Sequence, residues 1–203
     1  MAIKYKIYQS DYPYHIYNRT NNKEYLLTIP TAFPVFMNVL KYCAQRTDFR
    51  PHHVVLMSNH FHLIGSTPKS NLNQFMCLFQ TLFSTKINEI SGRTNHIFGS
   101  RYGATVVASE LYISHLIRYV YQNPVVAGLS SSATSYRYSS LNHYISDTHS
   151  HWNLEYDPYL NSFHDHHRVS ELLRLSSLSL KKSDADYIQT RLKKKYFVID
   201  NIQ

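Results

Sequence analysis

The chain has 203 residues, 43% of them hydrophobic, which is enough for a core and fits one domain with an appended segment or one larger domain. It contains 21 Lys and Arg against 13 Asp and Glu, a formal net charge of +8. No run of about 18 apolar residues could span a bilayer, and the N-terminal residues lack the apolar region of a signal peptide. We therefore expect a cytoplasmic protein with no membrane partner, in which Cys43 and Cys77 are reduced core residues.

The basic charge is accompanied by 18 tyrosines. Phosphates attract cationic side chains and unstacked bases can lie on aromatic rings, so this composition is typical of a nucleic-acid binder. Many basic proteins bind no specific nucleic acid, however, and tyrosine is also a common core and strand residue. Composition alone leaves both interpretations open.

The first part of the chain predicts a strand followed by a helix. Residues 12–17 are aromatic and β-branched, which indicates a first strand. From Thr31 onward, apolar residues recur at steps of three and four. We therefore expect a helix with Thr31 as its N-cap, ended by Arg50-Pro51.

The middle of the chain predicts a hairpin, two helices and a fourth strand. Two apolar runs, over 52–57 and 60–66, are separated by two polar residues that suit a tight turn. A broad apolar stripe over 71–90 indicates a second helix. Residues 102–109 predict the fourth strand, and a third helix follows over 110–122.

This order of elements, β-α-β-β-α-β, predicts an α+β protein with a ferredoxin-like, split β-α-β antiparallel sheet. The third helix would then cross the other face or the edge of that sheet. Because the composition becomes polar and histidine-rich after residue 146, we expect a main domain over 1–146 and a C-terminal helical extension over 147–203. Two short helices, over 171–180 and 184–196, are predicted within the extension.

Two histidines lie inside an apolar run and flank one aromatic residue, Phe61. Successive side chains of a strand alternate between faces, so His60 and His62 point the same way. Two imidazoles on one side of a strand are half of a metal site. The alternative is a pair of surface histidines on an amphipathic strand in a histidine-rich chain.

A second candidate motif lies on the third predicted helix. Tyr119 and Asn123 are four residues apart and so share one helical face. Laid against the histidine strand, this helix would present an amide oxygen as a third metal ligand and a phenol as a nucleophile for phosphodiester cleavage. Asn123 precedes a proline, which disfavours helical geometry, so we expect the helix to end there. The alternative for Tyr119 is an ordinary core tyrosine.

Five sequence blocks carry a resemblance to a known family. They are Tyr17-Asn18-Arg19-Thr20, Leu56 to Leu63, His96 to Tyr102, Arg118 to Leu129, and Tyr136 to Ser140. Over residues 12–145 the chain resembles the single-tyrosine HUH nucleases, and most closely the REP-associated tyrosine transposases of the IS200-like family. The histidine block is specific to this family when it occurs together with the Tyr-x-x-x-Asn-Pro-Val-x-Ala-Gly block.

The resemblance implies a function and a set of site residues. His60 and His62 correspond to the metal ligands, Asn123 to the third ligand and Tyr119 to the nucleophile. Family members cleave single-stranded DNA near a hairpin with a divalent metal, usually Mg²⁺ or Mn²⁺, and form a 5′-phosphotyrosine intermediate. By this resemblance, residues 1–146 would be the catalytic domain of a monomer or homodimer.

Four further residues are candidates for DNA contact. Asn18, Arg19, Arg93 and Arg101 could bind bases or phosphates, and each could equally be a solvated loop residue. A different class of function also stays open: a catalytically silent, domesticated nucleic-acid-binding protein that uses the same sheet and loops. The complete set of histidines and tyrosine favours the enzyme, since a binding protein needs no nucleophile beside a metal.

Overall fold

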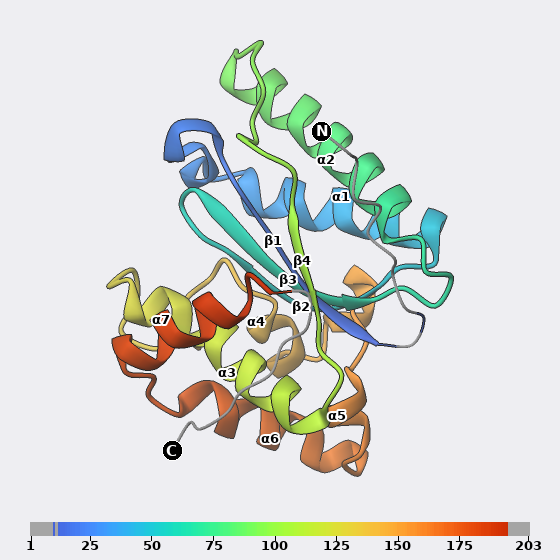
Figure 1. Cartoon of the computed structure of the whole chain (residues 1–203), viewed down its shortest axis with the longest axis vertical. Helices are drawn as coiled ribbons and strands as arrows, with labels where there is room; N and C mark the ends of the chain where they lie inside the picture. Colours follow the sequence, from blue (N-terminus) through green and yellow to red (C-terminus); the bar gives the residue numbers. More distant parts are fainter. Residues whose placement is uncertain (1–9, 11, 195–203) are drawn as a thin grey trace.

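The computed structural model describes residue 10 and residues 12–194. Four strands form one sheet: β1 Pro13–Arg19, β2 Arg50–Leu56, β3 His60–Ser66 and β4 Gly103–Val106 (Figure 1). Their order across the sheet is β2-β3-β1-β4, and each neighbouring pair is antiparallel. The α+β class and the ferredoxin-like, split β-α-β arrangement predicted from the sequence are confirmed.

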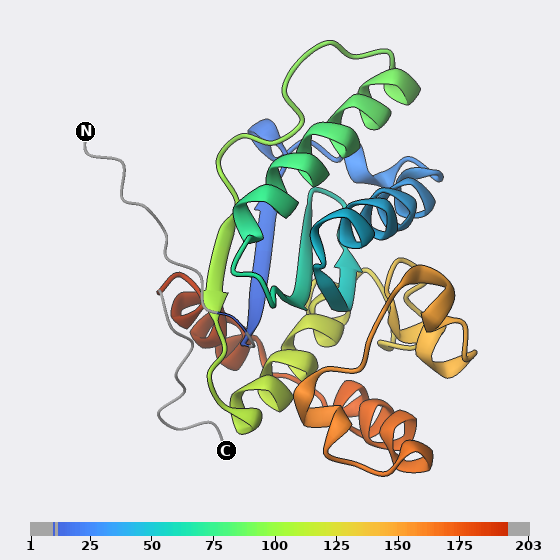
Figure 2. The ribbon, with the colours of Figure 1, turned by 90° about the vertical axis from the view of Figure 1, so that its right-hand side faces the viewer.

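Helices cover both faces of this sheet. α1 Ala32–Thr47 and α2 Leu72–Ser91 lie side by side on one face, and α3 Glu110–Val126 lies on the other (Figure 2). Phe61 of β3 points toward the first pair, because its ring packs against Phe36 of α1. The residues before and after Phe61 must therefore point toward α3.

An aromatic core fills the space between the sheet and the first two helices. The apolar stripe of α2 supplies Phe75, Phe79 and Phe83, all fully buried. Cys43 of α1 is buried as predicted, but Cys77 is exposed, so its assignment to the core is wrong. Cys77 lies off the stripe because it falls between the buried positions that repeat every three or four residues.

The third helix is longer than predicted. It does not end at Gln122 but continues through Pro124 to Val126. A proline near the end of a helix removes one backbone hydrogen bond, and the turn that follows it is still closed by bonds from Ala127 N to Asn123 O and from Leu129 N to Pro124 O. Asn123 is therefore helical, on the same helix as Tyr119.

The C-terminal part contains α4 Leu141–Ile145, α5 Pro158–Asn161, α6 Asp165–Ser177 and α7 Lys182–Arg191. Three short 3-10 helices, at Asn21–Lys23, Leu26–Thr28 and His149–Trp152, complete the described elements. The two predicted helices of the extension exist, but the first begins six residues earlier than expected, where Asp165 places a negative charge in the first turn. Residues 195 and 196 of the second prediction lie outside the described residues.

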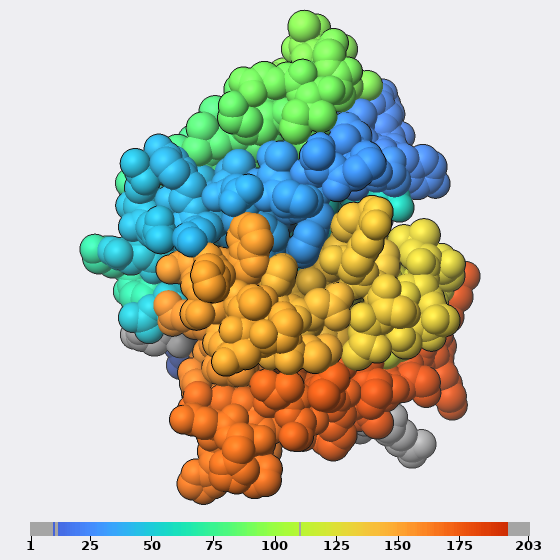
Figure 3. All heavy atoms as spheres, turned by 180° about the vertical axis from the view of Figure 1, so that it is seen from behind, coloured from blue at the N-terminus to red at the C-terminus, as the bar shows by residue number. Residues whose placement is uncertain are grey.

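The extension packs against the rest of the chain. Figure 3 shows residues near 150 lying directly against α1, where the Lys41 ammonium donates to the carbonyl of His151 at 2.5 Å. α6 and α7 both contact α3. The boundary at residue 146 stays a prediction. None of the helices in the described ranges is long and apolar enough to cross a membrane.

Candidate active site

A cavity of about 400 Å³ opens on the face of the sheet that α3 covers. Strands β1 and β3, helix α3 and the end of α7 supply its walls. The residues that line it are His15, Tyr17, Arg19, His60, His62, Tyr119, Gln189, Leu192 and Lys193. The two predicted histidines and the predicted tyrosine thus meet in one cavity.

Strand register explains why the β1 and β3 side chains gather there. Arg19 pairs with His60 and Tyr17 with His62 across the antiparallel ladder, and paired residues share a face. Gly103 of β4 pairs with Tyr17 on the other side. A side chain at Gly103 would collide with the Tyr17 ring, so the glycine makes room for this aromatic wall of the cavity.

Both histidines of the pair are oriented by a hydrogen bond at Nδ1. Nδ1 of His62 lies 2.8 Å from Nε2 of His15, and Nδ1 of His60 lies 2.8 Å from Oδ1 of Asn59. The Asn59 amide donates to the Lys23 carbonyl at 3.1 Å, which leaves its oxygen to accept from His60. With its proton on Nδ1, each of the two histidines can make this hydrogen bond and present the Nε2 lone pair.

The site favours neutral imidazoles. Burial lowers the pKa of His15 to about 3. Burial, helped by the charge of Arg19, lowers the pKa of His60 to about 4, and burial with the neighbouring histidines holds the pKa of His62 well below its usual value. All three rings are therefore uncharged at neutral pH, the form in which histidine binds a metal.

The histidine pair fits a divalent cation. Nε2 of His62 is buried and has no hydrogen-bond partner, which is costly unless a ligand satisfies it. The His60 and His62 ring centroids lie 5.1 Å apart. Over the described part of the chain, no three or more His, Cys, Asp or Glu side chains cluster as a metal site. The remaining ligands of an ion here would have to be amide, water or phosphate oxygens.

Tyr119 stands beside the histidines. Its ring centroid lies 5.6 Å from that of His62 and 6.3 Å from that of His15, edge-on to both. Burial raises the pKa of Tyr119 to about 12, although hydrogen bonding by Asn123 and the charge of Arg19 act in the opposite direction. The phenol is therefore protonated at neutral pH and needs help to act as a nucleophile.

Asn123 lies next to Tyr119 but does not line the cavity. Its side-chain nitrogen donates to the backbone carbonyl of Tyr119 at 2.9 Å, and Asn123 is not among the lining residues. The amide that lines the cavity belongs to Gln189 of α7. The metal-ligand role of Asn123 stays a prediction.

The four candidate DNA contacts are dispersed. Arg19 lines the cavity, whereas Asn18 is buried on the opposite face and donates to the Ser100 carbonyl at 3.1 Å. Arg93 forms an ion pair with Glu24, with 2.8 Å between Nη2 and Oε2. Arg101 is exposed and lines a second hollow. Their roles in DNA binding stay predictions.

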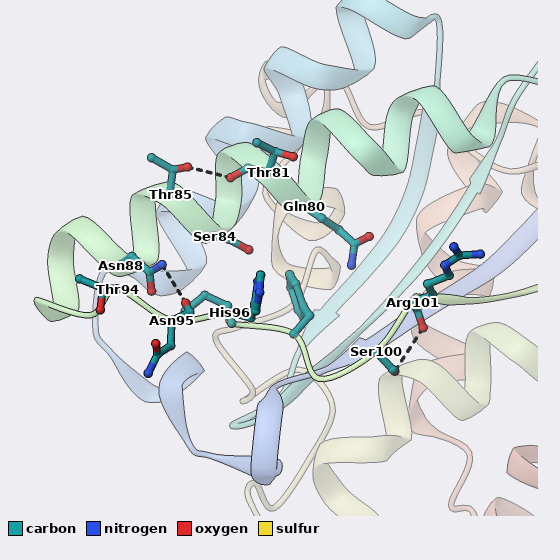
Figure 4. A pocket seen from close by; sticks show the side chains of 12 residues that line it. Gln80, Thr81, Ser84, Thr85, Asn88, Thr94, Asn95, His96, Ser100 and Arg101 are labelled. Carbon is teal, nitrogen blue, oxygen red and sulfur yellow. Dashed lines mark hydrogen bonds between the residues drawn. The ribbon is translucent and has the colours of Figure 1, made fainter.

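The second hollow is a polar groove of about 600 Å³ between α2 and the loop that leads to β4 (Figure 4). We call it the α2 groove. Amide and hydroxyl side chains dominate its walls: Gln80, Thr81, Ser84, Thr85, Asn88, Thr94, Asn95, His96, Ile97, Phe98, Ser100 and Arg101 line it. The side-chain oxygen of Asn88 is buried there without a partner. The loop is joined to β1 by a bond from Gly99 N to Arg19 O.

Five lining residues of the cavity are not among the site residues predicted from the sequence: His15, Tyr17, Gln189, Leu192 and Lys193. The place of His15 could have been predicted, because it alternates with Tyr17 and Arg19 along one strand and so shares their face. The place of Gln189 and Lys193 in the cavity could not be predicted, because no periodicity in the chain indicates that the end of α7 docks beside Tyr119.

Comparison with known proteins places the chain in a family. The profile of the IS200-like transposases matches residues 8–123, more than half of the chain. The chain therefore belongs to the IS200-like transposase family. No curated protein matches the sequence.

Two solved structures resemble this one. The first is of a REP-associated tyrosine transposase bound to a REP hairpin, with 16% identity and a TM-score of 0.61 over 72% of this chain and 86% of that one. The second is of a Deinococcus radiodurans R1 protein assigned as a transposase, with 15% identity and a TM-score of 0.42 over 59% of this chain and 94% of that one. The first likeness supports the fold.

Proposed function

We propose that the protein is a metal-dependent single-stranded DNA endonuclease and strand transferase that acts through Tyr119. The observation that carries the proposal is the unpartnered, buried Nε2 of His62 beside the Tyr119 ring. A phenol next to a nitrogen atom with a free lone pair is better suited to phosphodiester cleavage than to a purely structural role in the core. The REP hairpin in the structure of the REP-associated transposase supports hairpin-flanked DNA as the substrate.

His60 and His62 would hold the ion, which we expect to be Mg²⁺ or Mn²⁺. When bound, the ion would withdraw charge from the non-bridging phosphate oxygens and stabilise the negative charge that builds on them in the transition state. Neutral histidine ligands leave its full 2+ charge for that task. The third protein ligand is proposed to be the Asn123 amide oxygen, which would require its side chain to turn away from the Tyr119 carbonyl.

The chain's own residues then account for the transfer. The Tyr119 phenol oxygen forms a bond to phosphorus while the bond from phosphorus to the 3′ oxygen breaks. The phenol proton ends on that oxygen, so the products are a 5′-phosphotyrosine and a free 3′ hydroxyl. A 3′ hydroxyl can later attack the phosphotyrosine and restore a DNA bond without ATP, because the enzyme ester conserves the bond energy.

One assay tests the proposal. The full chain is incubated with labelled single-stranded DNA that carries a hairpin, with Mg²⁺ or Mn²⁺, beside Tyr119→Phe and His62→Ala. We expect a denaturation-resistant adduct with the wild type alone. DNA binding without any adduct across a broad oligonucleotide panel would instead favour the catalytically silent, domesticated binder. Sizing of the free and DNA-bound protein would separate monomer from homodimer.

A further inference from the structure

The end of α7 gives the cavity a cation that the strands and α3 do not supply. We propose that Lys193 binds the phosphate at which cleavage occurs, together with Arg19, so that the C-terminal extension completes the active site. This inference rests on the proposed function and adds to it a phosphate-binding residue from a distant part of the chain. Three observations support it. The end of α7 docks beside the cavity, the charges in the cavity are positive, and the side chains of Arg19 and Lys193 have no ion-pair partner among the described residues.

The position of Lys193 is fixed by its neighbour. Leu192 is buried, and its carbonyl accepts a hydrogen bond from the Thr105 hydroxyl at 2.5 Å. Thr105 pairs with His15 across the sheet, so this bond ties the end of α7 to the strands that carry the histidines. Lys193 follows directly and lines the same cavity as Tyr119.

The segment before α7 is held to the helix that carries the nucleophile. Arg118 of α3 donates to the carbonyls of Leu178 and Ser179, and the Gln122 amide donates to the carbonyl of Ser176. These residues flank Tyr119 on its own helix. The extension is therefore attached both to α3 and to the sheet.

The charges of the residues that line the cavity favour binding of an anion. None of its lining residues in the described part of the chain is an Asp or Glu. Arg19 and Lys193 are its cations, and the structure gives neither side chain an ion pair or hydrogen bond within the described residues. Two unpaired cations facing a carboxylate-free cavity favour a phosphodiester, whose charge increases as the phenol attacks. Asp186, the acidic residue of α7 that acts on Tyr119, does not line the cavity.

Lys194 offers a matched control. It is the next residue, it carries the same charge and it is exposed, but it does not line the cavity. Lys193→Ala and Lys194→Ala therefore remove equal charge from adjacent positions, one inside the site and one outside. Both side chains are exposed, so we expect wild-type thermal unfolding for both variants.

The first measurement is binding without cleavage. In a Tyr119→Phe background, affinity for the hairpin oligonucleotide is measured at several salt concentrations. A lost phosphate contact lowers the slope of log K against log salt by about one, and we expect this for Lys193→Ala but not for Lys194→Ala. Equal slopes for the two variants would overturn the proposal.

The second measurement is the rate of adduct formation with Tyr119 present. We expect Lys193→Ala to lower this rate at least about tenfold, by analogy with the loss of one transition-state donor, while Lys193→Arg recovers part of it. A wild-type rate would overturn the proposal, and so would a faster rate, which would mean that the end of α7 covers the site. If the wild type forms no adduct, the proposed function fails, and the salt slopes still decide whether Lys193 contacts phosphate.

Discussion

The His53 imidazole and the Asp157 carboxylate form a fully buried pair, with Nε2 and Oδ2 2.7 Å apart. Nδ1 of His53 meets the Tyr121 hydroxyl at 2.8 Å, and that hydroxyl meets Ser140 Oγ at 2.9 Å. Asp157 also caps α5 through the backbone N–H groups of Tyr159 and Leu160. One carboxylate thus connects the sheet, α3 and the extension.

The first prediction concerns the pH dependence of stability. Burial alone would raise the pKa of Asp157, but the hydrogen bond and charge of His53 hold it below its usual value. A carboxyl whose pKa is lowered by folding stabilises the native state above its unfolded-state pKa of about 3.9. This stability is lost as the pH falls through the folded-state pKa. Denaturant titrations from pH 7 to pH 3 should therefore show a falling free energy of unfolding at the acid end, and a shallower fall in Asp157→Asn. Equal slopes would contradict this.

The second prediction concerns removal of the buried carboxylate. Asp157→Ala leaves His53 without its partner and removes the cap of α5. Breaking a buried pair from one side costs about 3–5 kcal/mol, and we expect a loss of that size in the free energy of unfolding. Asp165→Ala is the control, because Asp165 pairs with Arg168 at the surface, where ion pairs contribute little. Similar losses in the two variants would show that the burial of the pair is not what matters.

The third prediction concerns His15, which we regard as a positioning residue for His62. Removal of the partner that orients a metal-binding histidine typically weakens metal affinity about 10–100-fold. We expect His15→Ala to weaken Mn²⁺ binding by that factor in calorimetric titration, and His15→Gln to recover part of the loss, because the amide oxygen can accept from Nδ1 of His62.

His52→Ala serves as the control for His15. His52 is also buried, but it bonds Ser66 and the Glu155 carbonyl and does not line the cavity. Its removal should lower stability and leave Mn²⁺ affinity unchanged. If both alanine variants weaken Mn²⁺ binding equally, a general loss of structure accounts for the effect and His15 has no special role.

The fourth prediction concerns Gly103 and Tyr17. The added methyl of Gly103→Ala would press on the Tyr17 ring, and overpacking typically costs about 1–3 kcal/mol. Tyr17→Ala should relieve this clash, so the double variant should be more stable than the sum of the single effects predicts. Denaturant unfolding of the wild type, the two single variants and the double variant measures the coupling energy. If the losses in the free energy of unfolding are strictly additive, the Tyr17 ring does not depend on a glycine at position 103.

The sheet and its helices follow from the sequence because each element has a local period. The Phe61 alternation fixes which face the histidines use, and the stripe of α2 fixes which face of that helix is buried. The end of α3 was not predicted correctly. A proline only disfavours helical geometry in the residue before it, and the hydrogen bonds that close the turn after Pro124 outweigh this effect.

From residue spacing alone, the site could be predicted only where its residues share an element. His60 and His62 lie two residues apart on one strand, so spacing places them together. Lys193 and Gln189 reach the cavity through tertiary contacts, such as the Thr105 bond to Leu192, between residues 87 positions apart. Nothing in a local pattern encodes such a pairing, so the contribution of α7 becomes visible only in the folded chain.

The last prediction separates the two arginines near the α2 groove. The Arg101 side chain is exposed and has no ion-pair or hydrogen-bond partner among the described residues, whereas Arg93 is already neutralised by Glu24. If the DNA strand follows the groove from the cavity, Arg101→Ala should weaken oligonucleotide binding and lower its salt slope by about one. Arg93→Ala should change the slope little, since no free charge is lost. Fluorescence anisotropy at several salt concentrations measures both, and a larger slope change for Arg93→Ala would place the strand elsewhere.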